Sequence, residues 1–289
     1  MQQYFTKSKI FLIIIVFVIA QILGSGLAVG IVELLPWLSK YPDASFEILR
    51  GGPSLLLILW FLYDFRKKGF SLINEFKGVR NHIGYKDFFA ILLFNIFIGL
   101  FSVYAIIYLV VQFMPADQLS NMAHSNDLAG VTTLTGTVLG GIVAVFLAPL
   151  AEEFIFRGFL FTKFQAKFSV WVSMVLSSIL FAAIHISLSS ITTFLFGLSL
   201  CIVFYKTKNL AIPILLHVLN NAIVSTIAIY GALFPQPKTT DVSFDGISQD
   251  FYRIAVPCFV IAMLLGYYLV KKRNMLRLDK PFILRKKPA

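Results

Sequence analysis

Long apolar runs recur along this chain and constrain its fold more than any other feature. An α-helix needs about 20 apolar residues to cross the hydrocarbon core of a bilayer. Such runs occur at roughly 10–35, 46–64, 88–114, 134–165, 169–189, 190–206, 210–233 and 251–270. Only 13% of the residues are charged, against about 25% in an ordinary soluble domain. The sequence therefore predicts an all-α, polytopic membrane bundle of about eight helices.

The segments between these runs leave no room for a soluble domain. The longest of them have about twenty residues, fewer than a separate hydrophobic core requires. We therefore expect residues 1–289 to form a single integral membrane domain.

The net charge of +11 is distributed unevenly along the chain. If the N-terminus lies inside and the runs alternate, 21 of the 25 basic residues fall inside, and Lys40, Arg50, Lys238 and Arg253 fall outside. This bias predicts that both termini are cytoplasmic. The basic C-terminal tail is then expected to lie against anionic lipid rather than nucleic acid. The Phe-, Ile- and Lys-rich composition favours the cytoplasmic membrane of a bacterium.

Three charges interrupt the fourth apolar run. Residues 139–150 are apolar, and Glu152, Glu153 and Arg157 follow them closely. An ionisable group at membrane depth costs a few kcal/mol on insertion scales, so it usually faces a protein cavity and serves a function. These three residues are therefore the first candidates for a functional site.

Helical spacing separates the two glutamates. Residues four apart share a helix face, so Glu153 and Arg157 are expected to form an intrahelical ion pair. Glu152 points about 100° away from Glu153 and is left without that partner.

Two histidines interrupt later runs, although a lone histidine in a helix is more often a satisfied structural residue. Phe181 lies one turn before His185 and could hold its imidazole by packing, and His217 shares a helix face with Asn221. The runs at 134–165 and 169–189 are expected to form an antiparallel hairpin.

With the hairpin turn centred between residues 168 and 169, Glu152 and His185 are each 16.5 residues from it. That separation corresponds to about 25 Å along each helix, which places the two side chains at one depth. His217 is only seven residues after Leu210, so its helix must start deep or tilt to bring it level.

A carboxylate, two imidazoles and an amide in a membrane cavity are suited to hydrolysis. Glu152 could take a proton from a water that His185 holds from the other side. Attack of this water builds negative charge on a carbonyl oxygen, which donors in a dry site stabilise strongly. His217 and Asn221 are suitable donors, and no serine, cysteine or threonine nucleophile is needed.

The motifs Glu152-Glu153-x-x-x-Arg157, Phe181-x-x-x-His185 and His217-x-x-x-Asn221 occur in this order on successive runs. Together they resemble the motifs of the CPBP family, the CAAX-processing and bacteriocin-processing intramembrane proteases also called Abi proteins, which are similar to the Ras-converting enzyme. The resemblance covers about residues 130–235.

This resemblance implies a glutamate-dependent peptidase without a metal or other cofactor. By it, Glu152 is the catalytic base and His185 shares the water with it. His217 and Asn221 form the oxyanion site, while Glu153 and Arg157 support the architecture.

The sequence leaves other functions open. Glu152, His185 and His217 could ligate zinc in a membrane protease, although no H-E-x-x-H pair is present. A non-catalytic scaffold or bacteriocin-immunity protein of the same fold is a further possibility. A transporter would leave the spacing of His217 and Asn221 unexplained. For the protease, the expected partners are the lipid bilayer and a membrane-associated peptide or protein, prenylated or not.

Overall fold

The computed structural model describes residues 42–113, 133–185, 190–234 and 244–274, together with scattered residues before position 42. Every regular element within these ranges is a helix, which confirms the all-α class. The predicted span at 10–35 and the basic tail beyond residue 274 lie largely outside the described residues.

Six helices of the described chain are long and apolar enough to cross a membrane. They are α4 (Pro42–Lys67), α7 (Tyr85–Gln112), the continuous helix Leu134–Gln165, α13 (Ser190–Thr207), α14 (Ala211–Leu233) and the helix Gly246–Lys271. A shorter apolar helix, α12 (Val170–Ala183), corresponds to the predicted span at 169–189. These helices confirm a polytopic membrane bundle. The count of eight depends on the span at 10–35, so it stays a prediction.

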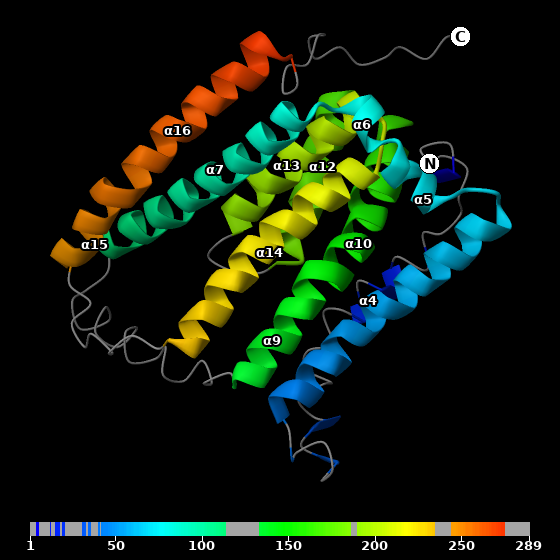
Figure 1. Cartoon of the computed structure of the whole chain (residues 1–289), viewed down its shortest axis with the longest axis horizontal. Helices are drawn as coiled ribbons and strands as arrows, with labels where there is room; N and C mark the ends of the chain where they lie inside the picture. The colour runs from blue at the N-terminus through cyan, green and yellow to red at the C-terminus, as the bar shows by residue number, and fades with distance from the viewer. Residues whose placement is uncertain are drawn as a thin grey trace.

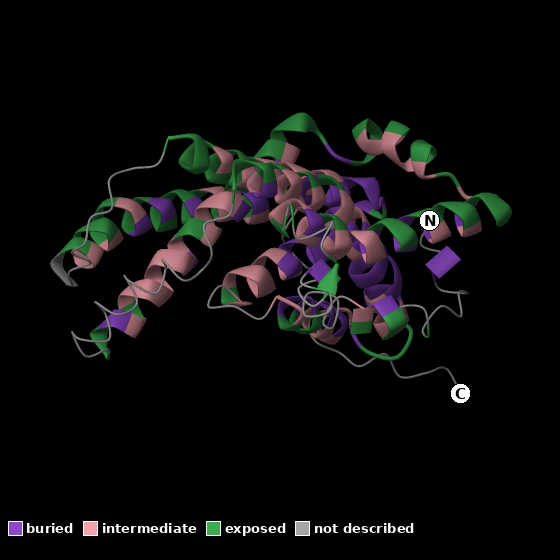
Figure 2. Cartoon of the chain, turned by 90° about the horizontal axis from the view of Figure 1, so that it is seen from below, coloured by how far each residue is buried: buried purple, intermediate pink, exposed green. Residues whose placement is uncertain are grey.

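The helices lie side by side in one bundle (Figure 1). α4 and α14 both pack against the helix Leu134–Gln165, and α12 packs along α13. α16 (Val256–Tyr267) lies along α7 at the edge of the bundle. Buried residues gather towards the middle of the molecule in Figure 2, whereas the outer helices are mostly exposed. The exposed surface of the spans is apolar, as expected for helices in contact with lipid.

The helix Leu134–Gln165 is not a uniform α-helix. Two π-helical segments, η1 (Val143–Leu147) and η2 (Phe154–Phe161), separate α9 (Leu134–Ile142), α10 (Ala148–Glu153) and α11 (Thr162–Gln165).

In η1, the N–H of Ala148 bonds the carbonyl of Val143 five residues back, rather than the carbonyl of Ala144. The next residue, Pro149, has no N–H to donate. The carbonyl of Ala144 is therefore released from the helix ladder and can accept a bond from another helix.

Glycines let α4 approach α9 closely. A Cβ at Gly136 would lie 2.7 Å from the Cβ of Asp43, and one at Gly140 would lie 3.1 Å from the carboxyl carbon of Glu47. Glu47 also forms an ion pair with Arg50 at 2.6 Å. The two charges that interrupt the start of the predicted span 46–64 therefore pair with each other.

Two short helices, α5 (Leu72–Lys77) and α6 (Val79–His82), connect α4 to α7 and cover the start of α14. The carboxylate of Glu75 accepts the backbone N–H of Leu210 at 3.1 Å, and its backbone carbonyl accepts Nδ2 of Asn209 at 2.8 Å. Asn209 and Leu210 are buried. α14 therefore begins inside the protein rather than at its surface.

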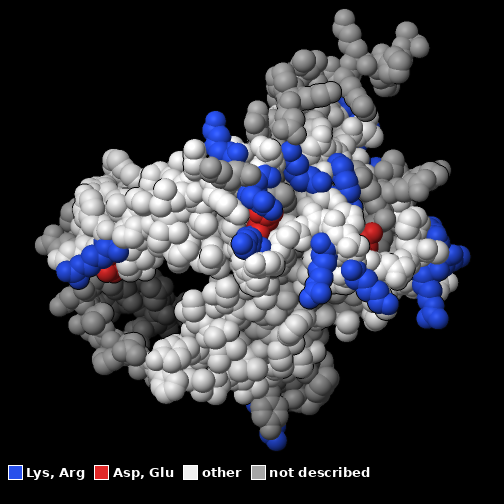
Figure 3. All heavy atoms as spheres, turned by 45° about the horizontal axis from the view of Figure 1, so that its top comes forward, with Lys and Arg blue, Asp and Glu red and all other residues white. Residues whose placement is uncertain are grey.

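Basic residues gather on one face of the molecule, which Figure 3 shows from the top of Figure 1. α4, α5 and α13 each carry basic residues in their last turn. This clustering is what the positive-inside rule describes at the cytoplasmic end of a bundle. The orientation of the termini stays a prediction.

Candidate active site

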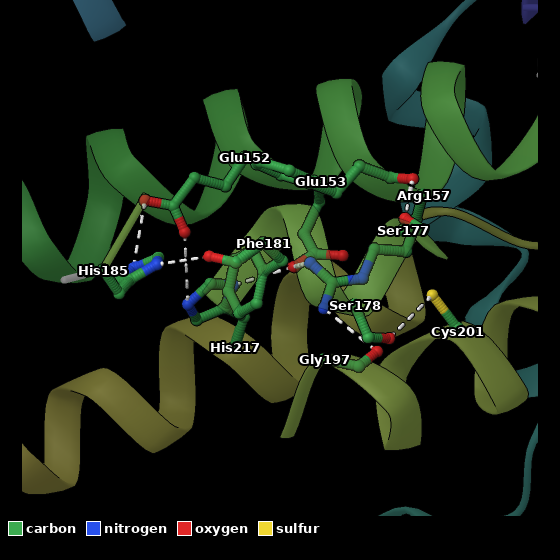
Figure 4. A network of polar contacts seen from close by, with 11 residues as sticks. Glu152, Glu153, Arg157, Ser177, Ser178, Phe181, His185, Gly197, Cys201 and His217 are labelled. Carbon is green, nitrogen blue, oxygen red and sulfur yellow. Dashed lines mark hydrogen bonds and ion pairs between the residues drawn. The ribbon is translucent and has the colours of Figure 1, made fainter. Parts of the chain in front are cut away.

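The end of α10 directs its two adjacent glutamates to different surroundings (Figure 4). The side chain of Glu153 is fully buried, whereas that of Glu152 keeps 13% of its surface exposed. The sequence-based separation of the two glutamates therefore describes their environments correctly.

Glu153 holds a buried ion pair. Nη1 of Arg157 donates to Oε1 of Glu153 at 2.7 Å, as the four-residue spacing predicts, and Nη2 donates to the carbonyl of Gly197 at 3.2 Å. The guanidinium also lies 4.4 Å from the centre of the Phe181 ring. A Cβ at Gly197 would lie 3.0 Å from Cδ1 of Phe181, so a glycine is what lets α13 come this close.

Glu153 also orients His217. Nδ1 of His217 lies 2.8 Å from Oε1 of Glu153, the same oxygen that binds Arg157. Because a carboxylate accepts, this contact places a proton on Nδ1. The other ring nitrogen, Nε2, then faces Glu152 and lies 3.8 Å from its Oε2. The ring is buried and packs edge-to-face on Phe196 at 5.0 Å between centres.

His185 reaches Glu152 from the opposite side. The helix α12 ends at Ala183, so His185 lies just beyond the helix. The sequence had suggested a position within the helix. Its Nδ1 bonds the carbonyl of Phe181 at 2.8 Å, and its ring packs against the Phe181 ring at 4.8 Å. A carbonyl only accepts, so Nδ1 carries a proton and the neutral ring has a free lone pair on Nε2.

The carboxylate of Glu152 therefore lies between two imidazoles. Nε2 of His185 is 3.9 Å from Oε1, and Nε2 of His217 is 3.8 Å from Oε2. These separations are too long for direct hydrogen bonds and short enough for a bridging water. Within the described part of the chain, no hydrogen bond reaches the buried Oε2 of Glu152. The arrangement is suited to holding and deprotonating a water.

Asn221 follows His217 by one turn of α14 and has a different partner. Its Nδ2 donates to the carbonyl of Ala144 at 2.8 Å, the carbonyl that the wide turn before Pro149 releases. Its Oδ1 accepts a bond from Asn220 at 3.3 Å. One N–H of the amide is therefore engaged with the backbone, and the second N–H is the one that a substrate oxygen could use.

Three residues of the site gave no clear sequence signal. Phe196 and Gly197 belong to an apolar run, and Ala144 takes part only through its carbonyl. Pro149, two residues before the paired charges, is the one sequence feature that could have indicated a disturbed helix at this point.

Glu152, His185 and His217 are the residues that a zinc site would have to use. Among the described residues, no group of three or more His, Cys, Asp or Glu side chains has the spacing of a metal site. The two histidines approach different oxygens of Glu152, at distances that suit hydrogen-bonded water.

Comparison with known proteins matches the same part of the chain. Residues 134–223 match the family described as type II CAAX prenyl endopeptidase Rce1-like. An Escherichia coli relative, described as "Uncharacterized 24.3 kDa protein", is 30% identical over 91 residues. That alignment covers 29% of this chain and 42% of the relative. No solved structure matches the chain.

The matched segment contains every residue of the three motifs, from Glu152 to Asn221. It also contains the wide turn of η1 and the ring of Phe196 that packs on His217. Residues 134–223 of this chain are therefore similar to the Rce1-like type II CAAX prenyl endopeptidases.

Proposed function

We propose that this chain is an intramembrane endopeptidase that cleaves a membrane-associated peptide or protein by glutamate-dependent water activation. The observation that carries the proposal is the position of Glu152, whose two oxygens face Nε2 of His185 and Nε2 of His217 at 3.9 and 3.8 Å. The match to Rce1-like CAAX endopeptidases supports the same class of reaction.

In the proposed mechanism, a water lies between Glu152 and His185. Its two hydrogens point to Oε1 of Glu152 and to the lone pair on Nε2 of His185, which directs an oxygen lone pair at the substrate carbonyl. Glu152 takes one proton as the oxygen–carbon bond forms. The same proton then passes to the leaving amine as the peptide bond breaks, so the carboxylate is regenerated.

Stabilisation of the oxyanion falls to His217 and Asn221. Preorganised donors in a dry site stabilise developing charge far more than water does. The second N–H of Asn221 is available for this role, because its first already binds Ala144. His217 can donate from Nε2 in its imidazolium form, in which both ring nitrogens carry protons.

No metal or other cofactor takes part in the proposed reaction. Glu153 and Arg157 support it by holding His217, Phe181 and Gly197 in register. The bilayer is the medium for both enzyme and substrate, and we place the protein in a bacterial cytoplasmic membrane with both termini inside.

The test compares peptides from cells that carry the wild-type chain with those from cells that carry Glu152→Gln. This substitution keeps the shape of the side chain and removes the base. We expect peptides released by the wild type to disappear, with the uncleaved precursors accumulating in the membrane fraction, when both are measured by mass spectrometry. Glu47→Gln is the matched control, because it neutralises a carboxylate of another span.

A second experiment, on purified wild-type protein, can distinguish the metal-free reaction from a zinc-dependent one. Purified protein should keep its activity in a strong chelator and contain no stoichiometric zinc. Loss of activity to the chelator and its return with zinc would show a metalloprotease. Identical peptide patterns for wild type and Glu152→Gln would instead favour a non-catalytic scaffold or immunity protein.

A further inference from the structure

Three helices meet in an apolar cluster beside the active site, which we call the three-helix junction. It joins α7, α13 and α14 through Ile91, Leu92, Leu200, Val203, Ile212 and Leu216. His217 follows Leu216 directly on α14, so the junction and the active site share a helix.

Three polar side chains on α7 and α13 stand out because their buried atoms have no partner in the described chain. Both Oδ1 and Nδ2 of Asn95 are unbonded although the residue is only 4% exposed, and Oγ of Ser199 is unbonded at the same exposure. Oγ1 of Thr192 is buried and unbonded as well. A buried polar group without a partner is destabilising. Most such groups in native proteins bond to protein or to ordered water.

The three side chains lie along one helix interface. A Cβ at Gly99 would lie 3.4 Å from Cγ2 of Thr192. Gly99 of α7 and Thr192 of α13 are therefore opposite each other in the interface. Ile91 of α7 packs in the cluster that includes Leu200, so the two helices run in opposite directions. Asn95 and Ser199 therefore both lie on the same side of the Gly99–Thr192 contact, towards the apolar cluster.

The chemistry of these groups suits water. An amide and two hydroxyls are neutral and together offer both donors and acceptors, whereas a metal cation or an anion would call for charged ligands. We propose that the three-helix junction holds internal water bonded to Asn95, Thr192 and Ser199, and that this water replenishes the water consumed at Glu152. The supply role rests on the proposed function.

Phe196 contacts both the junction and the ring of His217. The ring of Phe196 packs against residues of both apolar clusters, and its centre is 5.0 Å from that of the His217 ring. Each cleavage consumes one water, whose oxygen enters the new carboxylate and whose hydrogens end on the two products. In this proposal, the water stored behind Phe196 reaches Glu152 for the next turnover through a rotation of the Phe196 ring.

The test uses the full-length protein in lipid nanodiscs and compares Asn95→Leu with Ser102→Ala. Both positions are on α7, but the hydroxyl of Ser102 already bonds the carbonyl of Ile98. Radiolytic hydroxyl-radical labelling with mass spectrometry detects bound water at buried side chains. We expect labelling of Ile91 and Leu200 in the wild type, although both are fully buried, and none at the equally buried Phe154 of the other cluster.

Asn95→Leu should remove this labelling, keep or raise the melting temperature, and lower kcat several-fold with little change in KM. Ser102→Ala should match the wild type in labelling. Absence of labelling at Ile91 and Leu200 in the wild type, or labelling that survives Asn95→Leu, overturns the water site. An unchanged kcat after the labelling is lost overturns the supply role. Normal cleavage by Glu152→Gln would refute the proposed function. The labelling result does not depend on that function, so the two failures can be told apart.

Discussion

At the scale of single residues, the site depends on how one oxygen of Glu153 is shared. Oε1 accepts from Nη1 of Arg157 at 2.7 Å and from Nδ1 of His217 at 2.8 Å. One buried carboxylate therefore holds a cation and an imidazole at once. Glu152, whose Oε2 has no hydrogen bond within the described part of the chain, faces the two Nε2 atoms.

Glu153→Gln should destabilise the protein by about 3–5 kcal/mol, because Arg157 would keep its buried charge without its partner. Thermal unfolding of the purified protein in detergent measures this loss. Glu47→Gln should cost much less, because its partner Arg50 is partly exposed and can be solvated. If Glu153→Gln instead folds well and is inactive while Glu152→Gln still cleaves, the roles of the two glutamates are reversed.

Asn221→Ala should lower kcat by about 10² to 10³ with little effect on KM, as expected on removal of one oxyanion donor. Steady-state cleavage of a peptide substrate measures both constants. Asn220→Ala is the neighbouring control, because its amide bonds only Asn221 among the contacts of the described chain. A double variant with His217→Ala should be less than additive, since both residues act on one developing charge. A normal kcat for Asn221→Ala would limit its role to binding Ala144.

At the scale of elements, the wide turn of η1 links the helix that carries Glu152 to the helix that carries His217. The N–H of Ala148 bonds the carbonyl of Val143, and Pro149 has no N–H. Neither residue therefore donates to the carbonyl of Ala144. Nδ2 of Asn221 takes their place. The start of α14 is held separately by Glu75, so two contacts far apart set the position of this helix.

Pro149→Ala should reduce kcat although it removes a helix breaker. The new N–H allows regular α-helical bonding, in which Ala148 returns to the carbonyl of Ala144 and competes with Asn221. Stability should stay the same or rise, and the effect on kcat should not add to that of Asn221→Ala. Pro213→Ala is the control, because that proline lies in the first turn of α14, where no helix bond is lost. Full activity of Pro149→Ala would show that the wide turn is not needed for catalysis.

At the scale of the whole molecule, the bundle separates its charges into two places. Arg157 and Glu153 lie buried within the bundle, and basic residues gather on the face that Figure 3 shows. A face of this kind lies at the cytoplasmic surface in most membrane proteins.

Reporter fusions test this orientation directly. Fusions after Lys68, Lys167, Lys208 and Ala289 should report the cytoplasm, because 21 of the 25 basic residues then lie inside. Fusions near Asp117 and Thr240 should report the opposite side. A cytoplasmic signal near Asp117 would contradict the predicted alternation of the spans.

Local rules determined much of this protein. Apolar length predicted the helices, because lipid requires each backbone group to bond within its own helix. The four-residue spacing predicted the pair of Glu153 and Arg157, since helix geometry brings such residues together whatever surrounds them. Equal distance from the hairpin turn predicted that Glu152 and His185 lie at one level, and Nε2 of His185 is 3.9 Å from Oε1 of Glu152.

Contacts between distant segments decided the rest. Glu75 holds the start of α14, and the ring of His217 is oriented by Glu153 and packed by Phe196. The partner of Asn221 is a carbonyl that becomes available only through a change in helix pitch. The sequence by itself determined which residues could do chemistry, because charge in an apolar helix is visible locally. Only the tertiary structure decided which of their atoms face one another, because those directions depend on packing between helices that the chain order does not specify.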